Sequence, residues 1–351
     1  MNARHRQAVI AVIAAIAAIA AITIVAPRAH AQRLFRTDST LTVTITTDLG
    51  PLLKQRDSLE LVKHPAVFSY DADGKPVSVR VRLRARGHFR RQAHNCDFPP
   101  LWLDVKSSDA KQTVLSGLNK LKITTSCRPK SAEYEQYILQ EYAVYRAYAA
   151  LTDASFRTRL LRITYRDTAG KVAPITTWGF FTEVAEDVAN HLQRKVLPAK
   201  GGRFADLQPE PLSLLSVFEY FIGNTDWSIS GLHNIALLQD STAEAIPIAF
   251  DFDWTGAVDA RYAFPDKTLP IHNVTERLYR GNCMTPDQFK TVIDRFRSKR
   301  AAIDAVFTQL PQLAPDRAKS MKRFFDDFWK RTDDPRGLQK EFAGDCQQAG
   351  N

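Results

Sequence analysis

The chain divides into two halves that differ in how their apolar residues are spaced. In the first half, residues 41–49 and 77–87 alternate apolar and polar side chains, which is typical of strands with one buried and one solvated face. Residues 118–126 indicate another short strand, and residues 159–184 indicate a hairpin that turns between Asp167 and Lys171. Between them, residues 134–152 repeat apolar and aromatic side chains every three or four positions, which predicts one amphipathic helix.

Helical spacing dominates the second half. A Gly- and Pro-rich loop at 198–211 separates a short helix from a longer one, and two short apolar strands follow. The predicted elements of this half are helices at 187–196, 212–222, 286–310 and 316–332, and strands at 234–238 and 246–250. We therefore expect an α+β protein with a strand-rich unit at 32–183, which contains one inserted helix, and a helix-rich unit at 184–351.

The first 31 residues have the pattern of a secretory signal. Arg4 and Arg6 precede an apolar run over 8–26, and Ala29-His30-Ala31 fits the small-x-small cleavage pattern. We expect cleavage before Gln32 and an exported protein, periplasmic or extracellular, with no stable membrane span. The alternative is an uncleaved anchor, since nineteen apolar residues are just enough to span a bilayer.

Export changes how the four cysteines are interpreted. An even number of cysteines in an oxidising compartment predicts two disulfides, for which three connectivities are possible. Pairing Cys96 with Cys127 and Cys283 with Cys346 is favoured because each pair closes a modest loop. A zinc site formed by the first two cysteines and nearby histidines is the alternative, but the spacing matches no compact ligand pattern.

Charge narrows the class of partners. The chain carries a net charge of +10, and removal of the signal takes away three arginines and no acid, which leaves +7. This balance suits phosphate-bearing or acidic partners. The basic residues form no stripe interleaved with aromatic residues, so we expect no nucleic-acid binding. No motif specifies an oligomeric state.

Two neighbouring segments combine acidic and amide side chains in a way that a simple connector does not need. GNTDWSISGLHNIALL spans 223–238, and PIAFDFDWTG at 247–256 places an Asp-x-Asp after an apolar run. Phosphoryl transfer requires a carboxylate near the acceptor hydroxyl and oxygen ligands for Mg²⁺ or Mn²⁺. We assign Asp226 as the catalytic carboxylate. The predicted metal ligands are Asn234, Asp251 and Asp253.

A cation for the phosphates of ATP is expected on the strand before the inserted helix. Lys122 shares one strand face with Lys120, and Glu141 follows nineteen residues later on the helix, which allows a lysine–glutamate pair. There is no GxGxxG motif, and the Arg-Gly turn RARGHFRR, with Arg86, is placed over the phosphates instead.

These segments resemble the CotH kinase-like family of exported and spore-coat proteins and, more distantly, the HipA-type kinases. The similarity covers about residues 40 to 300, and its specific part is Asp226 to Asp253; RARGHFRR and WGFFTE, which ends at Glu183, match the family's other motifs loosely. The resemblance implies an atypical two-lobed protein-kinase-like fold, ATP with a divalent metal, and Glu183 in the nucleotide site. One departure is that eight residues separate Asp226 from Asn234, where common kinases have five.

The predicted function is therefore an exported atypical kinase that transfers the ATP γ-phosphate to a hydroxyl of a protein substrate. A catalytically inactive kinase-fold protein with a binding or structural role in the envelope or at the cell surface is the first alternative. A metal-dependent phosphoesterase that uses the same carboxylates is the second.

Overall fold

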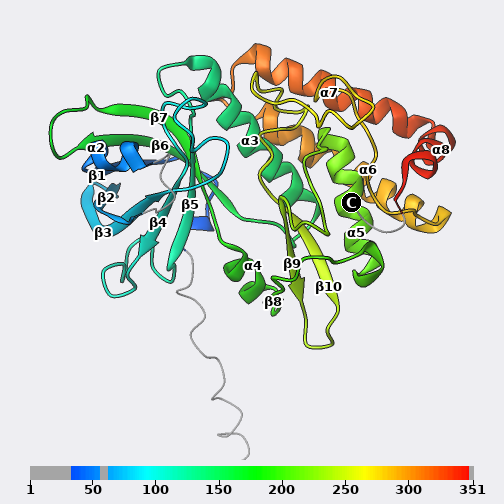
Figure 1. Cartoon of the computed structure of the whole chain (residues 1–351), viewed down its shortest axis with the longest axis horizontal. Coiled ribbons are helices and arrows are strands. Elements are labelled where there is room, and N and C mark those ends of the chain that lie inside the picture. Colours follow the sequence, from blue (N-terminus) through cyan, green and yellow to red (C-terminus); the bar gives the residue numbers. More distant parts are fainter. Residues whose placement is uncertain (1–32, 56–61, 348–351) are drawn as a thin grey trace, which may run out of the picture.

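The first half of the chain forms a closed barrel of seven strands. The computed structural model describes residues 33–55 and 62–347, so the predicted signal segment lies outside the described residues. The strands follow one another around the barrel as β1-β2-β3-β4-β5-β7-β6, and β1 and β6 close it by parallel pairing from Leu41 opposite Leu161 to Thr47 opposite Asp167 (Figure 1). The other neighbours in the barrel are antiparallel. The strand bounds are β1 (Leu41–Thr47), β2 (His64–Ala72), β3 (Lys75–Ala85), β4 (Leu101–Val105), β5 (Lys120–Thr125), β6 (Thr158–Asp167) and β7 (Ile175–Thr182).

The predicted two-lobed protein-kinase-like fold is wrong. In place of a strand-rich lobe, these strands wrap around their own apolar core, into which Ile45, Phe68, Leu83 and Leu121 point with no exposed surface. Alternation of apolar and polar residues shows only that each strand has one buried face. This pattern does not indicate which strands pair. The first strand pairs with the sixth, about 120 residues later, and this pairing closes the sheet into a barrel.

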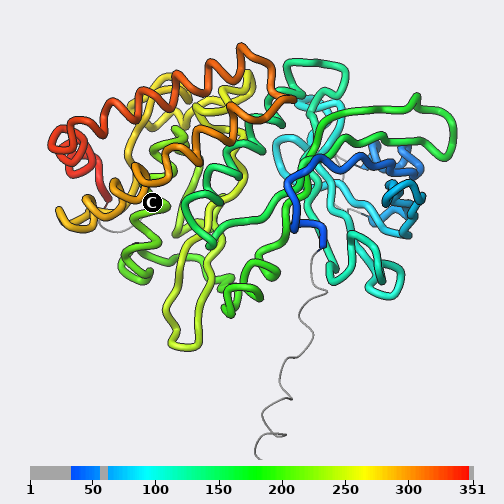
Figure 2. Tube along the Cα trace, turned by 180° about the vertical axis from the view of Figure 1, so that it is seen from behind, coloured from blue at the N-terminus to red at the C-terminus, as the bar shows by residue number. Residues whose placement is uncertain are grey.

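The second half packs helices around a small sheet of three strands, ordered β10-β9-β8. Figure 2 shows from behind that these helices lie beside the barrel rather than around it. The bounds of this part are α4 (Ala185–His191), β8 (Lys195–Val196), η3 (Phe204–Asp206), α5 (Pro209–Ile222), β9 (Ile235–Gln239), β10 (Ala245–Ala249), α6 (Pro286–Thr308), α7 (Pro315–Asp333) and α8 (Pro335–Asp345). Two short helical segments, η1 (Arg33–Phe35) and α2 (Leu49–Lys54), accompany the barrel.

One helix joins the two parts. Helix α3 (Ala132–Leu151) contacts β6 and β7 on one side and α6 and α7 on the other, and it runs between the barrel and the other helices (Figure 1). The prediction of a helix here is confirmed, but its polar face is not simply solvated. Gln140 and Glu141 are buried together with the apolar residues of the helix, because α3 is covered from both sides. A buried acid at this position needs partners, and it helps to form the site described below.

Two disulfides link segments in separate regions of the fold. Cys96 is bonded to Cys127 and Cys283 to Cys346, and no cysteine is free, so the predicted pairing is confirmed. Disulfides persist in oxidising compartments, so this pattern fits an exported protein. In the described part of the chain, no helix combines the length and the apolar composition needed to cross a membrane.

Candidate metal and phosphate site

The loop after α5 fixes the position of Asp226. Gly223 caps the C-terminal end of helix α5, and its φ of +66° lies in the left-handed region that favours glycine. Asn224 then donates a hydrogen bond from its side chain to the buried Glu219 carboxylate at 2.8 Å and accepts one from the Asp226 amide at 2.9 Å. The backbone before Asp226 is thus anchored to the interior of the helical part.

Asp226 and Asn234 lie next to each other, as two residues of one site should. The Asn234 amide nitrogen donates to the Asp226 carbonyl oxygen at 2.8 Å and to Asp226 Oδ2 at 3.1 Å. His233 Nε2 lies 2.8 Å from Asp226 Oδ1, and this hydrogen bond raises the pKa of His233. The described bonds of the Asn234 side chain use its nitrogen, so its amide oxygen is the atom that can serve a metal ion.

A cluster of three carboxylates lies beside this pair. One oxygen from each of Glu141, Asp251 and Asp253 falls within 4.8 Å of the others. Helix α3 holds two parts of the cluster in place. It carries Glu141, and it also carries Tyr145, whose hydroxyl accepts a hydrogen bond from the Asp251 amide at 2.8 Å. Asn234 and Asp251 both have left-handed backbone, with φ of +53° and +67°, a conformation that Asn and Asp tolerate better than most residues and that is common at functional sites.

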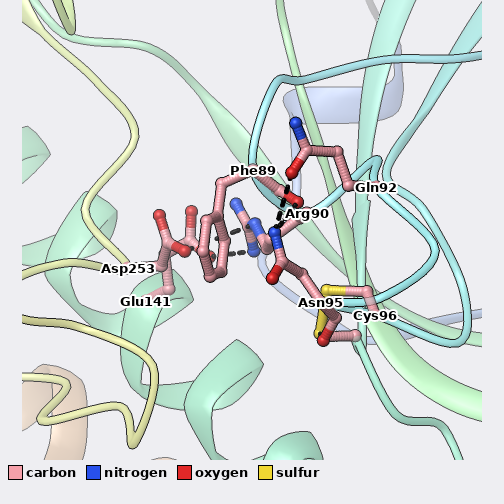
Figure 3. Close-up of a disulfide and its surroundings, with 8 residues drawn as sticks. Phe89, Arg90, Gln92, Asn95, Cys96, Glu141 and Asp253 are labelled. Atoms are coloured by element: carbon pink, nitrogen blue, oxygen red, sulfur yellow. Dashed lines mark hydrogen bonds and ion pairs between the residues drawn. A yellow bond between two sulfur atoms is a disulfide. The ribbon is translucent and has the colours of Figure 1, made fainter. Parts of the chain in front are cut away.

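An arginine that the sequence analysis did not assign occupies the centre of this cluster. Arg90 Nη1 lies 3.2 Å from Glu141, Nη2 lies 3.3 Å from Asp251, and Nε lies 3.3 Å from Asp253. Figure 3 shows the Arg90 guanidinium pointing at Glu141 and Asp253 from a loop near a disulfide. The only local signal was the Arg-Arg pair in RARGHFRR, and nothing in that pattern indicates which partner 51 or 161 residues away the side chain meets.

The electrostatics of the cluster differ from one acid to the next. Burial raises the pKa of Glu141 to about 8, and the opposing effect of Arg90 does not overcome it. Burial also raises the pKa of Asp253 to about 6. Burial acts in the same direction on Asp251, which is 37% exposed, but Arg90, Arg86 and Lys122 together lower its pKa. Asp251 is therefore the most acidic member of the cluster.

The other predicted residues are distributed around this centre. Lys122 Nζ lies 4.2 Å from the Phe250 ring, and burial lowers its pKa to about 8, while the ion pair of Glu141 is with Arg90 and not with Lys122. Arg86 donates from Nη2 to Thr124 at 2.9 Å. Glu183 is fully buried and is paired with Arg157 at 2.7 Å, so its contacts lie outside the acidic cluster.

Two adjoining cavities give the site its shape. The smaller, about 280 Å³, is lined by Arg86, Asp226, Asn234 and Asp251, among others. The larger cavity, about 660 Å³, adjoins the smaller one. It is lined by Ile235 and Phe250, which are the chain neighbours of Asn234 and Asp251 in the smaller cavity. This second cavity combines apolar side chains with two lysines and two acids; its lining includes Trp102, Lys120, Lys122, Phe156, Glu186, Asp187, Leu197, Ile235, Leu237 and Phe250. The smaller cavity is thus lined mainly by charged and polar side chains, and the larger one has apolar walls with charged groups among them.

No protein-family model matches this chain, and no curated protein or solved structure is significantly similar to it.

Proposed function

We propose that this protein is a divalent-metal-dependent phosphotransferase that moves the γ-phosphate of ATP to a hydroxyl group of a protein substrate. The observation that carries the proposal is the convergence of the Asp226–Asn234 pair and the Asp251–Asp253 segment on one small cavity. Carboxylate and amide oxygens are the ligands that Mg²⁺ and Mn²⁺ use when they also bind phosphates. Asp251, Asp253 and the amide oxygen of Asn234 would hold the ion, which when bound would neutralise phosphate charge.

Asp226 is the residue suited to act on the acceptor. Its carboxylate is held from one side by His233 and from the other by Asn234, so it is oriented before any substrate arrives. In the proposed reaction, Asp226 accepts the proton of the acceptor hydroxyl as its oxygen bonds to the γ-phosphorus. The bond from that phosphorus to the bridging oxygen breaks, and ADP leaves with the bond's electron pair.

The larger cavity is suited to the nucleoside. Its apolar lining offers a surface for a planar base, and Lys122 lies on the side toward Asp251, where it can reach phosphate oxygens. Arg86 lines the smaller cavity and supplies a second cation there. In this proposal Glu141 and Glu183 support the site by holding Arg90 and Arg157, and they do not contact the nucleotide.

The resemblance of residues 223–256 to the CotH family supports this chemistry, and the proposal does not depend on the kinase fold, which the barrel excludes. We further propose that residues 1–31 are a cleaved signal and that the substrate is met outside the cytoplasm. The two disulfides support this location.

One observation favours a protein that binds but does not catalyse. Arg90 already neutralises part of the acidic cluster, which is what a site without a resident metal would need. Such a protein would use the same cavities to bind a nucleotide or another phosphate without transferring it.

Transfer of labelled γ-phosphate from ATP to the protein itself or to a basic acceptor protein separates these functions. We expect transfer by the wild type and a loss of about a hundredfold or more in Asp226→Asn, the scale of a positioned acid–base group. Asp226→Asn should still bind nucleotide, whereas Asp251→Asn should lose both transfer and metal-dependent binding. Nucleotide binding without any transfer by the wild type would instead support the non-catalytic protein.

A further inference from the structure

The loop between β3 and β4 brings a permanent positive charge into the acidic cluster. The Arg90 side chain is 6% exposed, and each of its three guanidinium nitrogens faces a different carboxylate. Arginine does not lose its proton in proteins, so this charge is present at every physiological pH. Any cation that enters the cluster meets Arg90 as a fixed neighbour.

The loop that carries Arg90 is fastened by the Cys96–Cys127 disulfide, which closes the chain six residues after Arg90 (Figure 3). The amides of Asp97 and Phe98 donate to the Cys127 carbonyl oxygen at 2.9 and 3.1 Å, and the Asn95 side chain donates to the Phe89 carbonyl oxygen at 3.0 Å. The bonds to Cys127 join the loop to the segment that follows β5, and the Asn95 bond holds the loop together internally. On the other side of Arg90, the Phe89 ring packs edge-on against Trp254, 5.2 Å away.

The charge of the cluster decides which cations it favours. With a cation bound, which displaces the proton that burial favours on Glu141, the three carboxylates carry a charge of −3. Arg90 reduces this to −2, which matches one divalent cation. The Coulomb attraction of an ion scales with its own charge, so the repulsion from Arg90 is one and a half times larger for a trivalent than for a divalent ion. Glu141 Oε1 is buried and has no hydrogen-bond partner among the described residues, so the cluster retains an oxygen for a ligand.

We infer that Arg90 is a positioning residue that sets the cation selectivity of the acidic cluster, and that the Cys96–Cys127 disulfide holds it in place. The inference deepens the metal-binding part of the proposed function and rests on it. Its consequence is that oxidation of these two cysteines strengthens the divalent selectivity of the site.

Terbium luminescence provides the test, because Trp254 follows Asp253 directly and can sensitise Tb³⁺ bound in the cluster. The measured quantity is the ratio of Tb³⁺ to Mg²⁺ affinity, with Mg²⁺ as the competing ion. We expect this ratio to rise about tenfold or more in Arg90→Met, because a positive charge has been removed. Arg90→Lys keeps the charge and should stay near the wild-type ratio.

A second pair of variants tests the role of the disulfide. It also tests the inference if Arg90→Met does not fold. Cys96→Ala/Cys127→Ala should shift the ratio in the same direction by a smaller factor, and the matched control Cys283→Ala/Cys346→Ala should leave it unchanged. An equal loss of both ions in Arg90→Met, an unchanged ratio, or absence of sensitised Tb³⁺ in the wild type would overturn the inference. Cation binding with this selectivity but without phosphate transfer would refute the proposed function alone.

Discussion

A single buried acid supports the loop that positions Asp226. Glu219 is 1% exposed on α5, and its Oε2 accepts the hydrogen bond from Asn224 that anchors the loop. Its other oxygen has no hydrogen-bond partner among the described residues. Burial raises the pKa of Glu219 to about 8, so the folded protein holds this carboxyl protonated at neutral pH, whereas the unfolded chain ionises it near its ordinary value of 4.5.

This difference predicts that Glu219→Gln stabilises the protein at high pH. Between about pH 4.5 and 8 the folded state binds the proton and the unfolded state does not, so the wild type loses stability as the pH rises, by at most about 1.4 kcal/mol per pH unit. Glutamine keeps the acceptor for Asn224 and cannot ionise. Urea unfolding at pH 5 and pH 8 should show the variant gaining stability relative to the wild type. The control is Glu210→Gln, because Glu210 is an exposed acid on the same helix; this variant should show no such trend. If the stability of Glu219→Gln changes with pH in the same way as that of the wild type, the prediction is contradicted.

Residues close together in the sequence could be assigned to the candidate site, and those far apart could not. Asp226, Asn234, Asp251 and Asp253 lie within 28 residues, and two short strands bring their segments together, so a local pattern was enough. The partner of Glu141 could not be predicted in the same way. Position in the sequence does not tell whether Lys122 or Arg90 pairs with Glu141 on α3. The path of the loop after β3 places Arg90 against Glu141, while Lys122 lies over the Phe250 ring.

At the level of elements, closure of the barrel depends on β7 fitting between β5 and β6. Gly179 pairs with Thr125 on one side and Leu161 on the other. A Cβ atom at this position would lie 2.7 Å from Ile163 Cδ1 and 2.8 Å from the Thr124 carbonyl oxygen. The backbone oxygen cannot move away without disturbing the pairing of β5, which carries Lys122.

We therefore expect Gly179→Ala to destabilise the protein by roughly 1–3 kcal/mol, as overpacking of a core usually does. Gly344→Ala is the matched control, because residue 344 lies in α8 with no atom within 4 Å of a Cβ, and alanine there should be neutral or stabilising by up to about 1 kcal/mol. Chemical denaturation of both variants measures the difference. Equal stability of Gly179→Ala and wild type would mean that β5, β6 and β7 do not pack as described.

Most of the strands and helices were predictable because each one buries a periodic face. Strands β2, β4 and β8 were not predicted, and β8 falls within the helix expected at 187–196, which ends at His191. LWLDV at 101–105 alternates as a strand should, but it is short and follows a Pro-rich turn. The architecture was not predictable either. Neither the parallel pairing of β1 with β6 nor the double coverage of α3 leaves a trace in local spacing, since both depend on contacts between distant segments.

At the scale of the whole molecule, the two disulfides limit the freedom of separate regions. Cys96–Cys127 spans 31 residues of the barrel, and Cys283–Cys346 spans 63 residues from the segment before α6 to the end of α8. Loop-closure entropy in the unfolded chain predicts that each bond contributes about 4 kcal/mol to the free energy of unfolding.

We expect the Cys283→Ala/Cys346→Ala variant to lose about this much stability, with its cation selectivity unchanged. Guanidinium unfolding of the oxidised wild type, the reduced wild type and the variant measures the loss, and the reduced wild type should be the least stable of the three. Identical midpoints for oxidised and reduced protein would show that the bonds do not constrain the unfolded chain.

Calorimetric titration of ATP with and without Mg²⁺ tests whether the acidic cluster and the adjoining cavity bind a nucleotide and a divalent cation together. We predict that Mg²⁺ tightens ATP binding to the wild type by about tenfold or more, which corresponds to about 1.4 kcal/mol. Asp251→Asn should bind ATP as weakly with Mg²⁺ as without it. The control is Asp326→Asn on α7, since Asp326 is paired with Lys322 and lines neither of the two site cavities; this variant should behave as the wild type. ATP binding to the wild type that does not depend on Mg²⁺, or no binding at all, would show that the two cavities are not a joint metal and nucleotide site.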